Sequence, residues 1–447
     1  MRNLRLWKIL LISLIINLTF LSGQSFPFAL DIKRHVLPNG LTLLHVERHN
    51  LPIITVTLLI KAGPFYEPAQ KAGLANLTAE LLTEGTKKRK AKDISEEIEF
   101  IGASLDSSAG SDFSTINLSV LKKDIDTGFE IFSDILLNPT FPEEEIKRKK
   151  DIIIGNLRRS EEDPSFVVDK VFRKEVYGDH PYGRLITGTE ETISRINRED
   201  IIKFHHDYYR PNNAILSIVG DITSEELQNL IGKYLAKWEM SSIPAEPKVS
   251  EVAKGKQVIQ IDKDLTQANI IIGHRGIKRE DPDYYAVTVM NYILGGGGFS
   301  SRLMQTIRDE MGLAYDIHSF FDSRKKGGLF SINVQTKNET ANTVIEEILK
   351  ELKRIKTEPV SDQELDDAKA YLTGSFTRRF DTNKKISDML VAVEYFNLGL
   401  DYLEKYPEYI KSVTKDDIIR VAKKYLDTDN YTLVVVAKQS VAKIKDR

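Results

Sequence analysis

Two stretches of this chain repeat one another: Ile196-Asn197-Arg198-Glu199-Asp200-Ile201-Ile202 and Val413-Thr414-Lys415-Asp416-Asp417-Ile418-Ile419. Each stretch continues as a helical pattern, reaches a tyrosine, turns at an asparagine and enters an apolar strand, at a constant offset of 217 residues. The matched positions are Tyr208 with Tyr425, Asn213 with Asn430, and residues 214–219 with 431–436. Matches over a helix, a turn and a strand favour an internal duplication over a chance likeness.

Hydrophobic periodicity in both copies predicts strands followed by helices. In the first copy, residues 36–44 have strand character and turn at Asn39-Gly40, a pair typical of β-hairpins. Further strands are expected at 53–62 and 114–121, and helices at 72–82, 91–101, 124–137 and 143–160. Residues 93–96 have the form of a capping box that opens the second of these helices. The second copy repeats the theme with strands at 258–261 and 270–274 and helices from Asp281, Ser301 and Asn342.

A linker is predicted between the two copies. Residues 239–256 contain an unusual density of serine and proline, at Ser241, Ser242, Pro244, Pro247 and Ser250. We therefore predict an α+β fold of two homologous α/β-sandwich domains, residues 26–238 and 257–447, each an antiparallel-rich sheet covered by helices. The linker would join them into a clamshell with an internal cleft.

The N-terminus, residues 1–25, has the pattern of a secretory signal peptide. Basic residues in the first eight positions precede an apolar run at 9–21 and the small residues Gly23 and Ser25. The run is short for a membrane span, although an uncleaved signal anchor stays open. We expect a mature chain that begins near Phe26 and works in the periplasm or outside a bacterial cell.

Composition excludes some classes of function. The 63 lysines and arginines nearly balance the 65 aspartates and glutamates, so no net charge steers the chain to nucleic acid or an acidic membrane. Hydrophobic residues at 41% and charged residues at 29% are typical of a packed, soluble protein. The cysteine count is 0, which excludes disulfides and thiolate zinc sites.

The predicted helix at 72–82 lies within Gly73-Leu74-Ala75-Asn76-Leu77-Thr78-Ala79-Glu80-Leu81-Leu82-Thr83-Glu84-Gly85-Thr86. This frame, with Lys-Ala-Gly-Leu-Ala at its start and Glu-Gly-Thr-Lys-Lys at its end, resembles the active-site helix of the pitrilysin, insulinase and mitochondrial processing peptidase family. Members carry the motif H-x-x-E-H. Its two histidines bind Zn²⁺ from one helical face, and its glutamate activates the metal-bound water.

The motif positions of this chain hold other residues. Asn76 stands for the first histidine, Ala79 for the glutamate and Glu80 for the second histidine. An amide oxygen is a poor zinc ligand, and alanine offers no base. The family's third ligand, a glutamate on a later helix, falls at Asn156 when counted back from the acidic segment 161–164. The resemblance therefore implies a degenerate zinc site, with no metal on this chain.

An unfamiliar metal site stays open as an alternative, built from Glu80, Glu84 or some of the 8 histidines. His205 and His206 are adjacent on a predicted helix and cannot share a face. The other histidines are scattered along the chain without ligand spacing. We therefore interpret each histidine as a surface or hydrogen-bonded residue.

The second copy keeps a different element of the family. The run Gly295-Gly296-Gly297-Gly298 leads into a helix and then to Gly312-Leu313-Ala314-Tyr315, and Arg308 and Tyr315 stand seven residues apart as in the family's C-terminal substrate element. The resemblance implies that this pair reaches across the cleft to a peptide carbonyl, where both groups can donate to a developing oxyanion. Arg302 does not match the spacing. The glycine run lacks the Gly-Lys-Ser/Thr of a phosphate loop, so we interpret it as a flexible turn.

Three functions follow as hypotheses. The first is a non-catalytic, substrate-binding subunit of an exported heteromeric zinc endopeptidase. It would supply Arg308 and Tyr315 to a homologous partner chain that carries the zinc, and it would act on extended peptides. The second is a peptide-binding or scaffold protein of the same fold with no catalytic role. The third is a self-sufficient peptidase with an unconventional metal site.

Overall fold

The structure is a computed structural model that describes residues 30–249 and 255–445. Ile32–Arg447 forms one compact unit. The predicted signal peptide at 1–25 lies outside the described residues. Within the described ranges, no helix combines the length and the apolar character needed to cross a bilayer.

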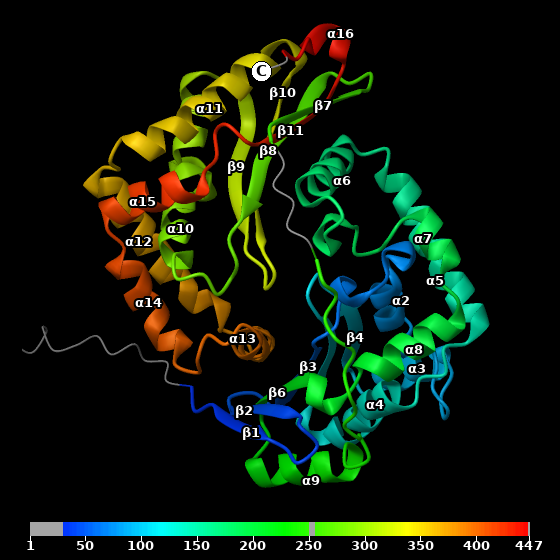
Figure 1. Ribbon diagram of the computed structural model, residues 1–447. Helices are drawn as coiled ribbons and strands as arrows, with labels where there is room; N and C mark the ends of the chain where they lie inside the picture. Colours follow the sequence, from blue (N-terminus) through cyan, green and yellow to red (C-terminus); the bar gives the residue numbers. More distant parts are fainter. Residues whose placement is uncertain (1–29, 250–254, 446–447) are drawn as a thin grey trace, which may run out of the picture. The chain divides into compact units, whose positions relative to one another are not determined.

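The first sheet has six strands in the order β1-β2-β6-β3-β5-β4 (Figure 1). Neighbouring strands are antiparallel except for β2 and β6, which run parallel. The central strands β3 and β6 are buried along nearly their whole length, as expected for apolar runs covered on both faces. The strands are β1 Lys33–Val36, β2 Thr42–Glu47, β3 Ile53–Ile60, β4 Ser104–Ala109, β5 Ser114–Leu121 and β6 Ala214–Gly220.

Helices from the first part of the chain accompany this sheet. The short helix α2 contacts strands β4 and β5 and helix α8, so the motif positions sit near the β4 edge of the sheet. The helices are α2 Leu74–Glu80, α3 Ala91–Phe100, α4 Ile125–Leu137, α5 Glu143–Ser160, α6 Pro164–Tyr177, α7 Glu190–Arg195, α8 Arg198–Tyr208 and α9 Ser224–Tyr234.

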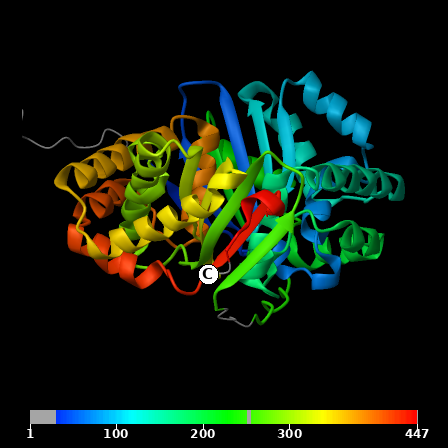
Figure 2. The ribbon, with the colours of Figure 1, turned by 90° about the horizontal axis from the view of Figure 1, so that it is seen from above.

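The second sheet has five strands in the order β7-β11-β8-β10-β9. Helices α10, α11, α12, α14 and α15 gather on one side of it in both ribbon views (Figures 1 and 2). The strands are β7 Gln257–Asp262, β8 Gln267–Gly276, β9 Ala314–Asp322, β10 Gly328–Lys337 and β11 Thr432–Ala437. The helices are α10 Tyr284–Asn291, α11 Ala341–Thr357, α12 Asp362–Phe376, α13 Asn383–Tyr395, α14 Tyr402–Ser412, α15 Lys415–Tyr425 and α16 Gln439–Ala442, with π-helical segments Tyr292–Gly296 and Met304–Glu310.

The two halves of the chain repeat one topology. Five strands of the first sheet, β2-β6-β3-β5-β4, correspond in order to β7-β11-β8-β10-β9 of the second. The repeated stretches become helices α8 and α15, whose N-cap residues Asn197 and Thr414 each form a capping box with an aspartate three residues later. Each helix is followed by an apolar central strand, β6 or β11. The predicted fold class, two related α+β units with helix-covered sheets, is confirmed.

One helix from each half packs against the sheet of the other half. Helix α6 contacts β8 and β11, and helix α13 contacts β3 and β6. On α13, the Asn383 Nδ2 donates to the Ile53 carbonyl at 3.1 Å, and Glu394 accepts two hydrogen bonds from Arg34 at 3.0 and 2.8 Å. Phe172 on α6 belongs to one buried apolar cluster with Ile271 and Val434. Each core is therefore completed by the other half of the sequence.

Several local predictions need correction. Asp93 does not begin helix α3: the N-cap is Lys90, and the Asp93 carboxylate accepts from the Lys90 N–H at 2.9 Å. The predicted helix at 72–82 is shorter, because α2 ends at Glu80 and a 3-10 turn follows. The helix expected from Ser301 is the π-helical segment Met304–Glu310. By contrast, α5 and β5 have the predicted bounds.

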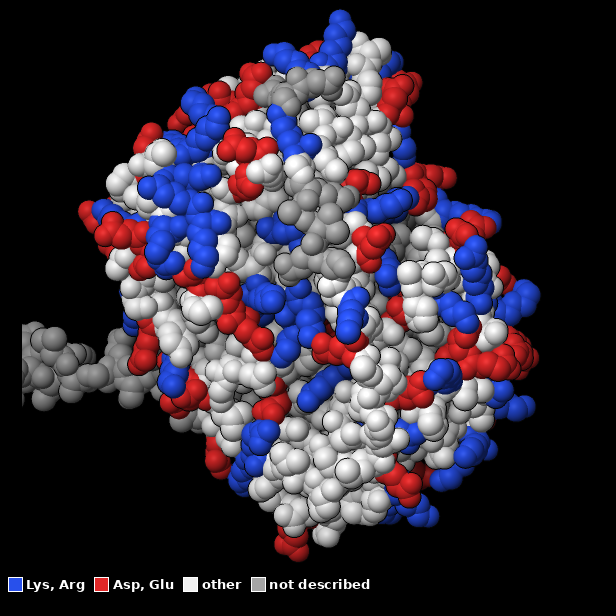
Figure 3. All heavy atoms as spheres, in the orientation of Figure 1, with Lys and Arg blue, Asp and Glu red and all other residues white. Residues whose placement is uncertain are grey.

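Charged side chains of both signs are mixed on one face of the molecule. On the face that Figure 3 shows, basic and acidic groups are interspersed, in keeping with the near balance of 63 basic and 65 acidic residues. This distribution gives no support to a nucleic-acid-binding surface on that face.

Candidate functional site

Helix α2 begins at a tightly packed position whose backbone conformation favours glycine. Gly73 has a φ of 98°, and a Cβ there would lie 2.5 Å from Cδ1 of Ile193 and 2.7 Å from the Thr187 carbonyl oxygen. The buried Glu67 carboxylate accepts the N–H groups of Gly73 and Ala75, both at 2.9 Å. Burial raises the pKa of Glu67 to about 8, although the two N–H donors act in the opposite direction. Glu67 therefore satisfies the first donors of the helix and fixes its start.

The three motif positions on α2 are brought together. Asn76 is buried, and its Nδ2 donates to Oε1 of Glu80 at 2.9 Å, one turn further along the helix. Ala79 between them is fully buried. Oε2 of Glu80 lies 3.8 Å from Nζ of Lys149 on α5. The side chains at the two histidine positions are thus hydrogen-bonded to each other, and the Lys149 ammonium lies beside Glu80.

Helix α5 supplies two basic residues to this region. Besides Glu80, Lys149 approaches Oε1 of Glu84 at 3.0 Å, and Arg148 donates to Oε2 of Glu84 at 2.6 Å. A dication at the motif positions would meet the Lys149 ammonium, and the carboxylates that could bind the metal are already paired. The residues present at these positions do not fit a zinc ion.

Asn156, the predicted position of the third ligand, is exposed on α5. Asn156 follows Lys149 by seven residues and Ile153 by three, so all three side chains lie on the same face of α5. Among the described residues, Asn156 forms no hydrogen bond with α2. Over residues 30–249 and 255–445, no group of three or more histidine, aspartate or glutamate side chains is arranged to hold a metal ion.

Most histidines have identifiable partners. His45 and His205 bond the carbonyls of Ile222 and Leu136 at 3.0 and 2.9 Å, and burial lowers the pKa of His205 to about 4. Other ring contacts pair His49 with Asp221, His180 with the Tyr182 N–H, His206 with Asp207, His274 with the Asp427 N–H, and His318 with Asp316. His35 is exposed. These surroundings agree with the interpretation of the histidines as surface or hydrogen-bonded residues.

Arg308 and Tyr315 lie close together on the second half. Arg308 is in the π-helical segment Met304–Glu310, and Tyr315 is near the start of β9. The Arg308 guanidinium carbon is 5.4 Å from the Tyr315 ring centroid and 4.5 Å from that of Phe299. Tyr315 is 86% exposed and Phe299 67% exposed. Cation–π contact with two aromatic rings and a 3.5 Å contact with the exposed Asp309 carboxylate hold the half-buried guanidinium in place.

Arg302 has a different role from Arg308. It is buried, and its guanidinium binds Glu364 through Nε at 2.6 Å and Nη2 at 3.1 Å. Glu364 also forms the capping box of α12 with Ser361. Arg302 therefore ties the segment after the glycine run to α12, while Arg308 is the arginine left accessible. The glycine run permits a close approach, since a Cβ on Gly295 would lie 2.6 Å from the Ser319 nitrogen.

Comparison with known proteins identifies the family of this chain. The model "Insulinase (Peptidase family M16)" matches residues 43–190, and the model "Peptidase M16 inactive domain" matches residues 195–372. The chain belongs to peptidase family M16. This confirms the resemblance to the pitrilysin and insulinase enzymes.

Relatives in family M16 carry contrasting descriptions. The chain is 26% identical over 360 residues to an "Uncharacterized zinc protease YmxG" of Bacillus subtilis, covering 80% of this chain and 86% of that protein. It is 26% identical over 401 residues to a "Non-peptidase homolog YmxG" of Helicobacter pylori, covering 89% and 92%. A crystal structure of a peptidase M16 inactive domain from Pseudomonas fluorescens matches with a TM-score of 0.84 at 28% identity, covering 91% and 98%.

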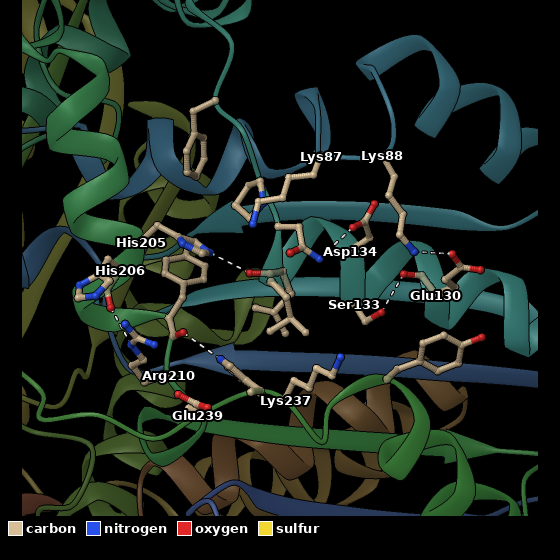
Figure 4. Close-up of a pocket in the computed structure, with 18 of the residues that line it drawn as sticks. Lys87, Lys88, Glu130, Ser133, Asp134, His205, His206, Arg210, Lys237 and Glu239 are labelled. Atoms are coloured by element: carbon tan, nitrogen blue, oxygen red, sulfur yellow. Dashed lines mark hydrogen bonds and ion pairs between the residues drawn. The ribbon is translucent and has the colours of Figure 1, made fainter.

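A large cavity lies away from the M16 motif positions (Figure 4). It has a volume of about 940 Å³ and is lined mainly from α4, α8 and α9. Its acidic groups are mostly paired: Glu130 with Lys88, Asp134 with Asn138, and Asp126 with Lys233. None of the predicted site residues lines it, so size alone does not point to the family's site.

Sequence reasoning missed three contributors to these two sites. Lys149 and Glu67 carry no motif of their own, and only the folded structure shows that they contact α2. Phe299 follows the glycine run directly, and an aromatic residue beside glycines was an available signal. Among the described residues, no hydrogen bond or ion pair joins Arg308 or Tyr315 to α2.

Proposed function

We propose that this chain is the non-catalytic, substrate-binding subunit of an exported heteromeric zinc metalloendopeptidase. One contrast within the chain carries the proposal. The motif positions on α2 hold Asn76, Ala79 and Glu80, beside the ammonium of Lys149. Arg308 and Tyr315, in the other half, are adjacent; Tyr315 is exposed and Arg308 is half-buried.

The zinc would reside on a partner chain of the same family that keeps the H-x-x-E-H motif. That metal would polarise the peptide carbonyl and supply the attacking water. This chain would contribute donors to the same carbonyl. The Arg308 guanidinium and the Tyr315 hydroxyl can each donate a hydrogen bond to an oxygen that gains negative charge.

Extended peptides are the substrates that the fold favours. Strand β9 is the last strand of its sheet, and Tyr315 is near its start. A peptide that added to the open side of β9 would gain main-chain hydrogen bonds and would run past Tyr315. Main-chain pairing of this kind gives broad selectivity, because side chains of the peptide alternate between two faces.

The descriptions of the two YmxG relatives, one a zinc protease and the other a non-peptidase homolog, support a family in which some members keep catalysis and others lose it.

Export is proposed from the sequence of residues 1–25. The test of export is N-terminal sequencing of the chain recovered from the periplasm, which should begin near Phe26.

Activity in a mixture tests the main proposal. The purified chain is combined with the H-x-x-E-H relative encoded nearest to it in the same genome, and cleavage of a quenched fluorescent peptide is followed. We expect cleavage only in the mixture. Tyr315→Phe and Arg308→Gln should lower kcat by about 10²–10³-fold, the usual effect of removing one oxyanion donor.

Matched controls separate this role from a general loss of structure. Tyr371→Phe removes a hydroxyl from another exposed tyrosine, and Arg195→Gln removes an exposed arginine; neither should change the rate. A mixture no more active than the relative alone contradicts the proposal. Stable homodimers without affinity for that relative would favour the scaffold function, and stoichiometric zinc in the isolated chain would favour the self-sufficient peptidase.

A further inference from the structure

A second cavity, of about 500 Å³, lies on the opposite face of α13 from the first sheet. We call it the Arg279 pocket; it is bounded by the segment before α10, the end of α12, helix α13 and the start of α14. Asn383, Ser387 and Glu394 of α13 bond the first half, whereas Met389, Ala392 and Phe396 line this pocket. These two sets fall on opposite sides of the helix at 3.6 residues per turn.

The pocket contains a buried arginine without a carboxylate. Arg279 is 9% exposed, and its guanidinium lies 3.7 Å from the Tyr284 ring centroid and 5.5 Å from that of Tyr402. Its Nη2 donates to the Tyr402 hydroxyl at 2.9 Å. Within residues 30–249 and 255–445, Arg279 forms no ion pair. A buried charge is costly unless it is paired, and aromatic contact compensates it only in part.

Two further arginines stand at the mouth of the pocket. Arg378 and Arg379 are exposed and line the same cavity. Neither forms an ion pair with any residue that the structure describes. Arg379 lies over the Phe376 ring at 5.8 Å, so its side chain is partly held in place. Three guanidinium groups therefore converge on one cavity.

One carboxylate, Asp388, lines the pocket and two others lie near it, and all three are paired with lysines. Asp388 binds Lys384 through Oδ2 at 2.6 Å, and Asp381 binds Lys385 at 2.9 Å. Glu280, next to Arg279, binds Lys325 at 2.8 Å. The positive charge of the three arginines is thus left without an anion from these neighbours.

Apolar side chains form much of the remaining wall, which also includes the ion-paired residues Lys385 and Asp388. Met389, Val393, Phe396, Leu398 and Phe376 line the cavity together with the arginines. A cavity of about 500 Å³ is within the range of small-molecule sites, which combine apolar walls with a few placed polar groups. We propose that the Arg279 pocket binds a carboxylate carried on an apolar group, with the carboxylate at the arginines and the apolar group along α13.

Planar, bidentate recognition explains why arginine suits this ligand. A guanidinium presents two parallel N–H groups to the two oxygens of a carboxylate, which a lysine cannot match. The proposal is independent of the peptidase function, because the pocket shares no residue with the Arg308–Tyr315 pair. The same chemistry is offered by a fatty acid and by the C-terminal residue of an apolar peptide.

Isothermal titration of the purified chain tests the proposal with four probes. Sodium decanoate represents the fatty acid, and N-acetyl-Leu-Phe with a free carboxylate represents the peptide end. Decanol and N-acetyl-Leu-Phe-amide lack the charge. We expect saturable binding, one molecule per chain, of at least one carboxylate, with no binding of its uncharged analogue. Affinity should fall as salt rises, since the contact is between charges near the surface.

Variants identify the site. Arg378→Gln with Arg379→Gln should weaken carboxylate binding about tenfold by removing two charge-assisted donors at exposed positions. Arg158→Gln with Arg159→Gln, a second pair of adjacent exposed arginines, should leave it unchanged. Arg279→Gln should abolish binding, and its thermal melt would show whether it folds. Absence of binding by both carboxylates, equal binding of decanol, or unchanged binding by the Arg378 and Arg379 double variant would each overturn the proposal.

Discussion

The substitution Leu390→Ala on α13 tests whether the two helices that pack against the other half's sheet, α6 and α13, hold the two halves together. Leu390 is 1% exposed, and its spacing places it on the helical face that carries Asn383, Ser387 and Glu394, toward strands β3 and β6. A buried Leu→Ala change costs about 3–4 kcal/mol from lost transfer energy and the remaining cavity. A unit of about 400 residues has an unfolding entropy near 0.9 kcal/mol/K, so the melting temperature should fall by about 3–5 °C.

Hydrogen exchange locates the effect of Leu390→Ala. Although the substitution is in the second half of the sequence, amides of β3 and β6 should lose protection, because α13 covers those strands. Leu352→Ala, at a buried position of α11 within the second half, is the control and should leave β3 and β6 unchanged. Unchanged protection of β3 and β6 in Leu390→Ala, with loss confined to the second sheet, would refute the reasoning.

Two further predictions concern single carboxylates. Burial opposes ionisation of Glu364, but hydrogen bonds from Arg302 and from the capping box lower its pKa to about 2. The ionised Glu364 stabilises the folded state at pH values above its unfolded pKa of about 4.5, and this stabilisation is lost as the pH falls toward 2. The free energy of unfolding of Glu364→Gln, measured with urea, should therefore depend less on pH between 5 and 3 than that of the wild type. Glu67→Ala should lower the free energy of unfolding by about 2–6 kcal/mol, since each of the two buried N–H groups left without an acceptor costs about 1–3 kcal/mol. Urea titration measures this loss, and a change within about 1 kcal/mol, as expected for half-buried Glu80→Ala, would contradict the role of Glu67.

The sequence predicted the elements with strong periodicity and clear ends. Helix α5 begins after Pro142 with three glutamates and ends with basic residues, and its predicted bounds are those of the structure. Strand β4 was missed because Ser104–Ala109 is rich in serine and has no β-branched residue. No sequence pattern shows that α6 and α13 each pack against the sheet of the other half, since an apolar helical face looks the same whichever sheet it covers.

The sequence predicted some features of the candidate sites and not others. Residue spacing pointed to Arg308 over Arg302, and the structure finds Arg302 buried against Glu364. The boundaries of the two domains and the roles of Arg308 and Tyr315 stay predictions. The contact of Lys149 with Glu80 depends on how α5 packs beside α2, and no local pattern encodes it. Contacts between elements distant in sequence were therefore the part that sequence reasoning could not supply.

The Asn76–Glu80–Lys149 contact bears on how many changes would be needed before α2 could hold a metal ion. A histidine at position 80 would leave Lys149 with Glu84 alone, and a glutamate in place of the fully buried Ala79 would place a new charge in the core. Neither change yields a ligand set while Asn76 and Asn156 remain. A metal site on α2 would therefore need changes at Asn76, Ala79, Glu80 and Asn156 together, and the surroundings of Lys149 would have to change with them.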